Sequence, residues 1–293
     1  MQYRKIVPPQ KIKLTESLVL EADSLNALRL FPSNSVQCAI TSPPYWGLRD
    51  YNINGQIGLE PTLQEFINRL VAVFNELKRV LCENGTLWLN IGDGYTSGNR
   101  GYRATDKKNP ARAMSLRPDT PEGLKPKDLQ GIPWRLAFAL QDDGWYLRSD
   151  IIWNKPNAMP ESVKDRPTKS HEYLFMFTKS EQYYYNYEAS KEIGLNGEYR
   201  NRRTVWNINT QSFQEAHFAT FPQKLIEPCV LISSRPDDFI LDPFFGSGTV
   251  GVVCVQNKRR YIGIELNPEY IEIAANRLSV LDTEETNILK LAV

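Results

Sequence analysis

The sequence predicts an α/β fold, because apolar runs of strand length alternate with segments whose apolar residues recur at helical spacing. Between Pro61 and Glu83 the apolar residues fall three or four positions apart, and Asn84-Gly85 follows as a helix stop. Val36–Thr41 is an apolar run that ends at a proline-rich turn. Near the carboxyl end, a strand, a glycine-rich turn and a helix succeed one another from Phe239 to about Asn257. The 293 residues are enough for one large layered domain.

The other expected elements follow the same two patterns, in chain order. Strands are expected at 18–20, 36–41, 86–91, 145–153, 172–177, 239–241 and 261–265, and helices at 61–83, 132–140, 222–233, from the glycine turn to about 257, and at 268–278. Periodicity disappears at about 95–130 and 181–218, so these two segments are expected to be irregular. The second contains the tyrosine cluster Tyr183, Tyr184, Tyr185 and Tyr187, interpreted as a strand packed on the sheet in preference to a base-stacking surface.

Composition narrows the class of protein. The chain has no run of about 18 apolar residues and no apolar segment with a cleavage site at its start, so neither a membrane span nor a signal peptide is expected. The four cysteines are scattered without a CxxC pair, which argues against a zinc site and a disulfide scaffold and fits a reducing cytoplasm. No metal site is therefore expected.

Charge is distributed unevenly. The formal net charge is only +1, but residues 100–127 hold eight Lys and Arg against three Asp and Glu. A local basic surface of this kind suits phosphate binding, and a solvated loop would have the same composition. Charge alone leaves both interpretations open.

The segment Asp242-Pro-Phe-Phe-Gly-Ser-Gly-Thr249 indicates a nucleoside site. Its glycines allow the backbone to approach a ligand at the start of a helix. A P-loop would need Lys-Ser/Thr after its last glycine, whereas Gly248 is followed by Thr249-Val250, so a nucleoside triphosphate is disfavoured. Glu265 ends the next strand, where an acid can accept both hydroxyls of a ribose. S-adenosylmethionine fits such a site because it carries no phosphate; the alternative is that Asp242 caps a turn and Glu265 is a solvated strand end.

The turn Thr41-Ser42-Pro43-Pro44-Tyr45-Trp46 has the equipment to bind an amino group on an aromatic ring. Its two prolines remove two backbone donors and stiffen the turn, which leaves carbonyl oxygens and the Ser42 hydroxyl as acceptors. Acceptors aimed at an exocyclic base amine would favour its pyramidalisation and help to carry the developing positive charge. The base would have to leave the duplex to reach this turn. A proline-rich structural turn with an aromatic plug is the alternative.

Three motifs together resemble the amino-group DNA methyltransferases: Ser42-Pro-Pro-Tyr45, Asp242-Pro-Phe-Phe-Gly-Ser-Gly-Thr249 and Ile264-Glu-Leu-Asn-Pro268. The catalytic motif precedes the cofactor motif, as in the β class, a circular permutation of the Rossmann-like methyltransferase fold. The resemblance covers roughly residues 15–280 and implies a mixed, mostly parallel sheet with helices on both faces. TSPPYWGLRDY, LKPKDLQGIPWR and HFATFPQKLIEPCV are similar to the N4-cytosine branch of phages and restriction–modification systems.

The resemblance also implies a role for each matching residue. Ser42, Pro43 and Pro44 would bind the target amine and Tyr45 would stack on the flipped base. The cofactor residues would be Asp242, Phe244, Gly246, Gly248 and Thr249 beside the methionine part, Glu265 at the ribose, Asp23 at the adenine and Lys224 at the methionine carboxylate. Adenine-N6 members usually carry Asp where this chain has Ser42, so serine favours cytosine, and N6-adenine is the runner-up. Two further functions stay open: transfer to RNA or a small amine, and DNA-binding regulation with a vestigial cofactor site.

DNA contacts are expected mainly outside these motifs. Residues 1–293 are expected to form one methyltransferase domain, with the basic loop at about 95–130 and the irregular segment at about 181–215 as candidate recognition elements. The candidate phosphate-binding residues are Arg100, Arg103, Lys107, Lys108, Lys125, Lys127, Lys155, Arg202 and Arg203. Neither His171 nor His217 has a metal-ligand partner at short spacing, so structural roles are expected for both. The expected partners are double-stranded DNA and a cognate restriction endonuclease, for a cytoplasmic monomer or homodimer.

Overall fold

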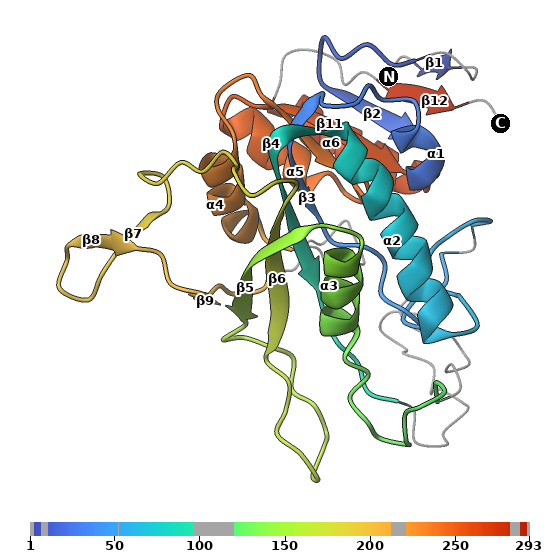
Figure 1. Ribbon diagram of the computed structural model, residues 1–293, viewed down its shortest axis with the longest axis vertical. Coiled ribbons are helices and arrows are strands. Elements are labelled where there is room, and N and C mark those ends of the chain that lie inside the picture. The colour runs from blue at the N-terminus through green and yellow to red at the C-terminus, as the bar shows by residue number, and fades with distance from the viewer. Residues whose placement is uncertain are drawn as a thin grey trace.

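The computed structural model describes residues 3–6, 11–51, 53–96, 120–211, 221–281 and 288–291. In these ranges a ten-stranded sheet has the order β1-β12-β2-β11-β10-β3-β4-β6-β5-β9, and a separate hairpin pairs β7 with β8 (Figure 1). The strands are β1 (Tyr3–Ile6), β2 (Leu18–Glu21), β3 (Val36–Thr41), β4 (Leu81–Ile91), β5 (Tyr146–Asn154), β6 (His171–Thr178), β7 (Lys191–Ile193), β8 (Tyr199–Asn201), β9 (Val205–Asn207), β10 (Phe239–Asp242), β11 (Arg260–Glu265) and β12 (Ile288–Leu291). β6 runs antiparallel to both its neighbours and the other paired strands of the large sheet are parallel, so the expected mixed, mostly parallel sheet is confirmed.

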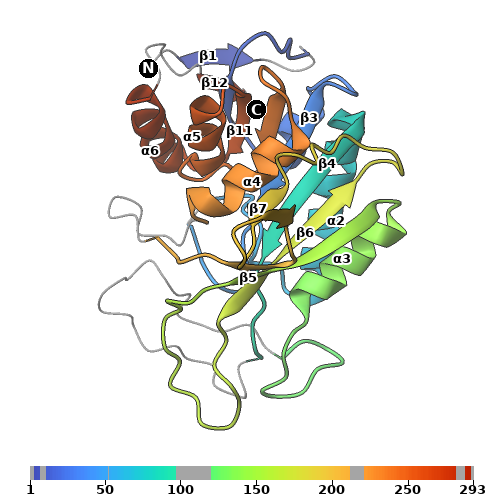
Figure 2. The same ribbon diagram turned by 90° about the vertical axis from the view of Figure 1, so that its left-hand side faces the viewer.

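The helices cover both faces of the sheet. They are α1 (Ser24–Leu28), α2 (Leu63–Val80), α3 (Ile132–Asp142), α4 (Gln223–Ser233), α5 (Thr249–Gln256) and α6 (Pro268–Ser279). One core cluster contains the buried residues of α1, α2 and α3, and a second contains those of α4, α5 and α6. Figure 2 shows α4, α5 and α6 together on one side of the strands, with α2 and α3 on the other side.

Side-chain alternation along the strands assigns each residue to one of the two clusters. Leu87 and Leu89 of β4 pack with α2, whereas Trp88 between them faces α4, and its indole N–H donates to the Ser233 hydroxyl at 2.7 Å. Strand residues point alternately to the two faces of a sheet, so central strands covered on both faces are apolar throughout. β3 accordingly has all six residues buried.

The predicted end of the helix expected at 61–83, which is α2 in the structure, was wrong. α2 begins with a capping box at Thr62 and Glu65, but it ends at Val80, and β4 begins at Leu81. Leu81 continues the helical spacing, yet its backbone is extended and it pairs with Val36 across the sheet. Asn84-Gly85 therefore lies within β4 and is not the helix stop. Pairing with a neighbouring strand outweighed the local pattern.

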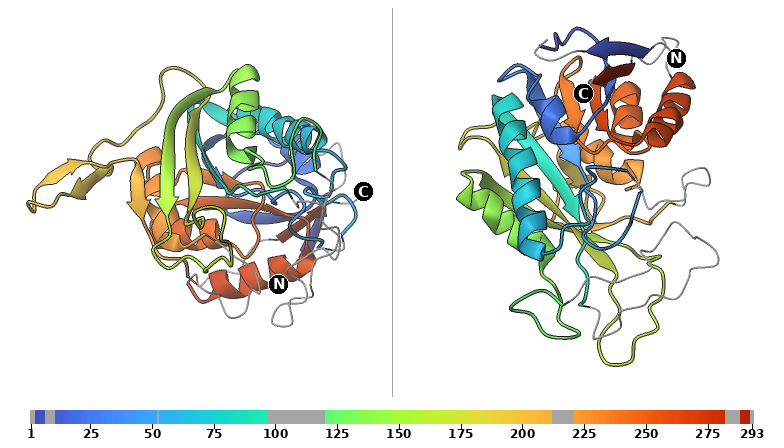
Figure 3. Two further views of the ribbon diagram at one scale, coloured as in Figure 1. Left: turned by 90° about the horizontal axis from the view of Figure 1, so that it is seen from below. Right: turned by 90° about the vertical axis from the view of Figure 1, so that its right-hand side faces the viewer.

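The segment 181–218 contains more regular structure than its sequence predicts. The β7–β8 hairpin and β9 lie within it, and β9 extends the sheet by pairing with β5. The hairpin projects from the body of the molecule (Figure 3, left). The tyrosine cluster is not the expected strand: Tyr183 packs against the second core cluster, whereas Tyr185 and Tyr187 are exposed. The short helix α1 and the strands β1 and β12 were not predicted either.

Candidate active site

The two predicted loops meet at the carboxyl edge of the sheet. β3 and β10 are adjacent parallel strands, with Cys38 opposite Ile240 and Ala39 opposite Leu241. From β10 the chain passes through α5 to β11 on one side, and from β3 it passes through α2 to β4 on the other. Ligands of open α/β sheets bind at such a point, where the connections diverge. Ser42 and the Asp242 turn are thus neighbours although two hundred residues separate them.

A buried hydrogen bond joins the two loops. The Thr41 hydroxyl donates to Asp242 Oδ1 at 2.6 Å, and the Phe244 backbone N–H donates to the same oxygen at 3.0 Å. Asp242 is 1% exposed, and this burial raises the pKa of its carboxyl group to about 7, against the lowering effect of the two hydrogen bonds. The carboxyl group therefore fixes the end of β3 relative to the turn after β10.

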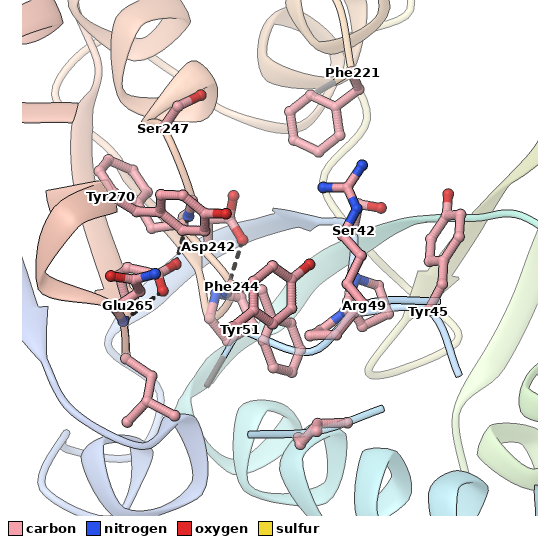
Figure 4. A pocket seen from close by; sticks show the side chains of 18 of the residues that line it. Ser42, Tyr45, Arg49, Tyr51, Phe221, Asp242, Phe244, Ser247, Glu265 and Tyr270 are labelled. Carbon is pink, nitrogen blue, oxygen red and sulfur yellow. Dashed lines mark hydrogen bonds between the residues drawn. The ribbon is translucent and has the colours of Figure 1, made fainter. Parts of the chain in front are cut away.

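One cavity of about 270 Å³ opens where these loops meet. Ser42, Pro43, Pro44 and Tyr45 line one end, and Asp23, Glu265, Phe244 and Gly246 line the other, with Asp242 and Thr249 also in the wall. Figure 4 shows Ser42 and Tyr45 on one side of the cavity, Glu265 and Tyr270 on the opposite side, and Asp242 between them. The volume is near the lower end of that of small-molecule sites, which begins at roughly 300 Å³.

Glu265 ties the glycine turn to the next strand. Its Oε2 accepts the Gly246 backbone N–H at 2.7 Å, and its Oε1 accepts the Asn267 backbone N–H at 2.8 Å. Burial raises the pKa of the Glu265 carboxyl, and the backbone hydrogen bonds oppose this increase. Each carboxylate oxygen can accept a second hydrogen bond, so Glu265 retains the capacity to receive ribose hydroxyls.

Two of the predicted cofactor residues lie elsewhere. Gly248 is not among the cavity-lining residues; its φ is +77°, and a Cβ there would lie 2.9 Å from Ala274 Cβ, so glycine allows α5 and α6 to pack closely. Lys224 is exposed in the first turn of α4 and does not line the cavity, whereas Phe221 just before that helix does. Asp23 lines the cavity and also caps α1 by accepting the Asn26 N–H at 3.0 Å.

The predicted base-stacking residue belongs to a network that sequence reasoning missed. The Tyr45 hydroxyl donates to Glu172 Oε2 at 2.9 Å, and Lys155 Nζ donates to Glu172 Oε1 at 2.5 Å. Burial, followed by the nearby Glu172 carboxylate, raises the pKa of Tyr45. Glu172 and Lys155 both line the cavity beside Ser42. The position of Glu172 at the start of a strand was the only sequence signal.

The loop that follows the Ser42-Pro43-Pro44-Tyr45 turn forms another wall of the cavity. Arg49, Tyr51 and Ile53 line it, and the Tyr51 ring lies edge-to-face with Tyr270 of α6, at 6.0 Å between centroids. The Gln56 side chain fixes this loop by accepting the Tyr51 N–H at 2.8 Å and donating to the Arg49 carbonyl at 3.2 Å. Aromatic and cationic residues so close to the catalytic turn were the signal that could have located it.

The predicted DNA-contact residues have different environments. Arg100, Arg103, Lys107, Lys108 and His217 lie outside the described residues. Lys125 and Lys127 are exposed beyond the carboxyl end of β4, and Lys127 pairs with Asp165 at 2.8 Å. Arg202 packs on the Trp206 ring at 5.2 Å, and Arg203 is exposed. Lys155 faces the cavity network.

His171 precedes Glu172 on β6 and contacts the Tyr173 ring at 5.4 Å, and its pKa is lowered chiefly by burial. Among the described residues, no group of three or more His, Cys, Asp and Glu could hold a metal ion. No helix in the described ranges is long and apolar enough to cross a membrane.

The hydrogen-bond acceptors and the apolar surface of the cavity fit S-adenosylmethionine. Glu265 and Asp23 supply acceptors at strand ends, and Phe244, Leu266 and Tyr270 supply apolar surface for an aromatic ring. The turn from Asp242 to Gly248 has no lysine for a phosphate chain, in keeping with a nucleoside that carries an amino acid.

Comparison with known proteins agrees with this geometry. The N6/N4 methyltransferase family, described as DNA methylase, matches residues 36–276. The chain is 66% identical to the type II methyltransferase M.Cfr9I of Citrobacter freundii, over 100% of this chain and 96% of the relative. It is 56% identical to the type II methyltransferase M.SmaI of Serratia marcescens, over 89% and 90%.

Two solved structures have the same fold. PvuII DNA methyltransferase, described as cytosine-N4-specific, aligns with a TM-score of 0.69 at 20% identity, over 96% of this chain and 98% of that one. A DNA modification methylase of Thermus thermophilus, solved with S-adenosyl-L-methionine, aligns with a TM-score of 0.67 at 23% identity, over 94% and 99%. The family match and the near-complete similarity to M.Cfr9I, in agreement with the geometry of the cavity, identify the chain as a member of the N6/N4 DNA methylase family and a type II DNA methyltransferase.

Proposed function

We propose that this enzyme methylates N4 of a cytosine that is flipped out of duplex DNA into the cavity at Ser42. The observation that carries the proposal is that the Ser42-Pro43-Pro44 turn and the Asp242 turn line one cavity and are joined by the bond from Thr41 to Asp242. Ser42 supplies a hydroxyl where the resemblance associates adenine-N6 members with a carboxylate. The fold of a structure described as cytosine-N4-specific is compatible with this assignment.

The residues of the turn act on the target amine. The Ser42 hydroxyl and a proline carbonyl accept hydrogen bonds from the two N–H groups of the amine. These contacts favour a pyramidal nitrogen, whose lone pair is no longer delocalised into the ring. Bound S-adenosylmethionine supplies the electrophilic methyl group at its sulfonium. Holding the nitrogen at the wall opposite Glu265 positions it for an in-line approach, and such positioning can supply much of the rate. Tyr45, held by Glu172, stacks on the ring of the base.

The cofactor lies, in this proposal, between Asp23 and Asp242. Glu265 accepts the ribose hydroxyls, and Asp23 lies at the adenine end. Phe244, Gly246 and Thr249 line the methionine part. Because Lys224 lies outside the cavity, the carboxylate of the methionine is assigned to the part of the wall that includes Phe221 and Ser247.

Expression in a methylation-deficient host tests the proposal. Sequencing of the host DNA with a readout that separates the two products is expected to find 4-methylcytosine at one short motif. In vitro, Ser42→Ala is expected to lower kcat on the order of 100-fold, the size of loss seen when one transition-state hydrogen bond is removed. A map that contains 6-methyladenine instead would exclude the cytosine assignment.

Ser35→Ala is the matched control for Ser42→Ala. Ser35 lies at the opposite end of β3, where its hydroxyl donates to the Pro32 carbonyl at 2.8 Å. It is expected to retain wild-type transfer. Wild-type transfer by a folded Ser42→Ala enzyme would show that the hydroxyl has no part in the reaction.

We also propose that the whole chain forms one methyltransferase domain and that the segments at about 95–130 and 181–215 contact the duplex. Exposed cations on both segments, Lys125 and Arg203, support this assignment. A cognate restriction endonuclease with the same recognition sequence is the further proposed partner.

A further inference from the structure

An ion pair lies in the wall of the cavity next to the catalytic turn. Lys155, just after the end of β5, donates to Glu172 at the start of β6, and the side chains are 16% and 17% exposed. The other oxygen of Glu172 accepts the Tyr45 hydroxyl. All three residues line the cavity together with Ser42. The pair was not part of the predicted catalytic motif.

The position of the ammonium group is fixed from several sides. Lys155 Nζ lies 4.1 Å from the centroid of the Trp153 ring, and the indole N–H of Trp153 donates to the Ile208 carbonyl at 2.8 Å. The Lys155 backbone N–H donates to the Ser170 carbonyl at 2.8 Å. A lysine that only touched DNA phosphates would need neither an aromatic support nor a half-buried carboxylate. Lys155 is therefore held as a rigid donor inside the cavity.

Gly92 leaves room for this arrangement. A Cβ at Gly92 would lie 2.8 Å from Tyr45 Cε2 and 3.3 Å from the carboxyl carbon of Glu172. Glu172 fixes two groups at once, because its two oxygens accept the Tyr45 hydroxyl and the Lys155 ammonium. Both groups are therefore held by one carboxylate, in the cavity wall that Ser42 also lines.

The donors of the ammonium suit one edge of cytosine. An ammonium has three N–H donors, and among the described residues Glu172 is the hydrogen-bonding acceptor of one of them. Beside its N4 amine, cytosine carries the acceptors N3 and O2. Adenine carries N1 beside its N6 amine and then a C–H group. Along the Watson–Crick edge, cytosine therefore offers a second acceptor to a cation and adenine does not.

We propose that Lys155, oriented by Glu172, is a specificity-determining residue that donates to O2 of the flipped cytosine, with N3 as the adjacent acceptor. The proposal deepens the proposed function and rests on cytosine being the target. Tyr45 and Ser42 hold the ring face and the amine, and Lys155 reads the far end of the same edge.

The test uses a base that keeps the amine and lacks O2. The first substrate is an unmethylated duplex that contains the motif which the enzyme methylates in the expression host. In the second duplex, the target cytosine is replaced by the 2-aminopyridine C-nucleoside, which keeps the ring nitrogen equivalent to N3 and the exocyclic amine. The wild-type enzyme is expected to prefer cytosine by roughly 10–100-fold in kcat/KM, the discrimination of a good hydrogen-bonded base contact. Lys155→Met is expected to reduce kcat/KM on cytosine by a similar factor and to reduce the preference to about threefold or less.

Lys179→Met is the matched control. Lys179 follows the opposite end of β6, its side chain is 15% exposed, and it pairs with Glu83 at 3.1 Å. It is expected to keep the wild-type preference. The intrinsic reactivity of the analogue cancels, because each enzyme is compared with itself on the two duplexes.

A double variant protects the test against loss of folding. Lys155→Met leaves Glu172 without its cation, whereas Lys155→Met with Glu172→Gln removes the ion pair as a unit and avoids an unpaired carboxylate. Both should bind S-adenosylhomocysteine like the wild type by calorimetry. An unchanged preference for cytosine in a variant that binds this ligand would overturn the role of Lys155. A host map with 6-methyladenine would instead overturn the proposed function, so the two failures are distinct.

Discussion

Asp242 combines deep burial with two hydrogen bonds to a single oxygen. Both the Thr41 hydroxyl and the Phe244 N–H donate to Oδ1. Burial raises the pKa of the carboxyl group to about 7, from 3.8 for an exposed aspartate. The folded protein therefore binds more protons than the unfolded chain between about pH 4 and pH 7. Its free energy of unfolding falls as pH rises through this window, because the charged carboxylate is disfavoured where it is buried.

Replacement of Asp242 by asparagine tests this linkage. An asparagine oxygen can accept both hydrogen bonds, so the turn should be kept while the titrating proton is removed. Between pH 5 and pH 8 the free energy of unfolding of the wild type is expected to fall relative to Asp242→Asn by on the order of 2 kcal/mol. Urea denaturation of both proteins without cofactor at several pH values measures the difference. A difference that is constant across this range would contradict the raised pKa.

Single residues were predictable where the chemistry is local. Ser42 follows an apolar strand, Asp242 and Glu265 each end one, and the carboxyl ends of parallel strands converge on one edge of a sheet. Lys155 and Glu172 were not recognised as a pair, because their contact arises only when the antiparallel strands β5 and β6 align. Lys155 was therefore interpreted as a phosphate contact. The structure places it beside Trp153 in the wall of the cavity.

At the scale of elements, the two glycines of the turn between β10 and α5 have different roles: one lines the cavity and the other packs against a helix. Gly246 and Gly248 both have positive φ, but a Cβ at Gly246 would come no closer than 3.9 Å to a neighbour, whereas one at Gly248 would lie 2.9 Å from Ala274 of α6. The sequence pattern treated both glycines as cofactor residues. Burial of one against a helix could not be foreseen, because the position of α6 depends on the packing of the whole sheet.

Gly248→Ala is expected to lower the free energy of unfolding by about 2–4 kcal/mol. About 1–2 kcal/mol comes from the left-handed backbone and the rest from the contact of the new Cβ with Ala274. Gly55→Ala is the matched control, since its φ is +86° and nothing lies within 4 Å of the added atom. It should lose only the backbone component. Equal losses in urea denaturation would refute the packing role of Gly248.

Element boundaries were predictable where caps mark them and not where strands compete. Thr62 and Glu65 form the capping box that begins α2. The end of the same helix was placed three residues too late, because Leu81 satisfies the helical pattern and also pairs with Val36. β9 has only three residues, too few for an alternating pattern, and it forms because β5 offers an open edge.

At the scale of the whole molecule, the cavity lies at one edge of the sheet, and the opposite edge lies far from it. The cavity lies at the carboxyl ends of β3, β10 and β11, so under the proposed function a duplex that delivers a flipped base would lie across that edge. The net charge of +1 gives little general attraction to DNA. The proposed binding therefore depends on cations located near the cavity, such as Lys125, which lies on the segment that precedes α3 (Figure 1).

The salt dependence of DNA affinity tests which edge of the sheet contacts the duplex. Each phosphate contact lowers the slope of log K against log salt by about 0.9 for duplex DNA. Lys125→Gln is expected to weaken binding and to make that slope shallower by about 1, because an exposed lysine at the carboxyl edge releases a counterion on binding. Lys258→Gln removes the same charge from an exposed turn just before β11, at the opposite edge, and should leave the slope unchanged. Fluorescence anisotropy titrations at several salt concentrations measure both. Equal slopes for Lys125→Gln and the wild type would mean that the duplex does not cross the edge where Lys125 lies, and the basic segment would then be a solvated loop.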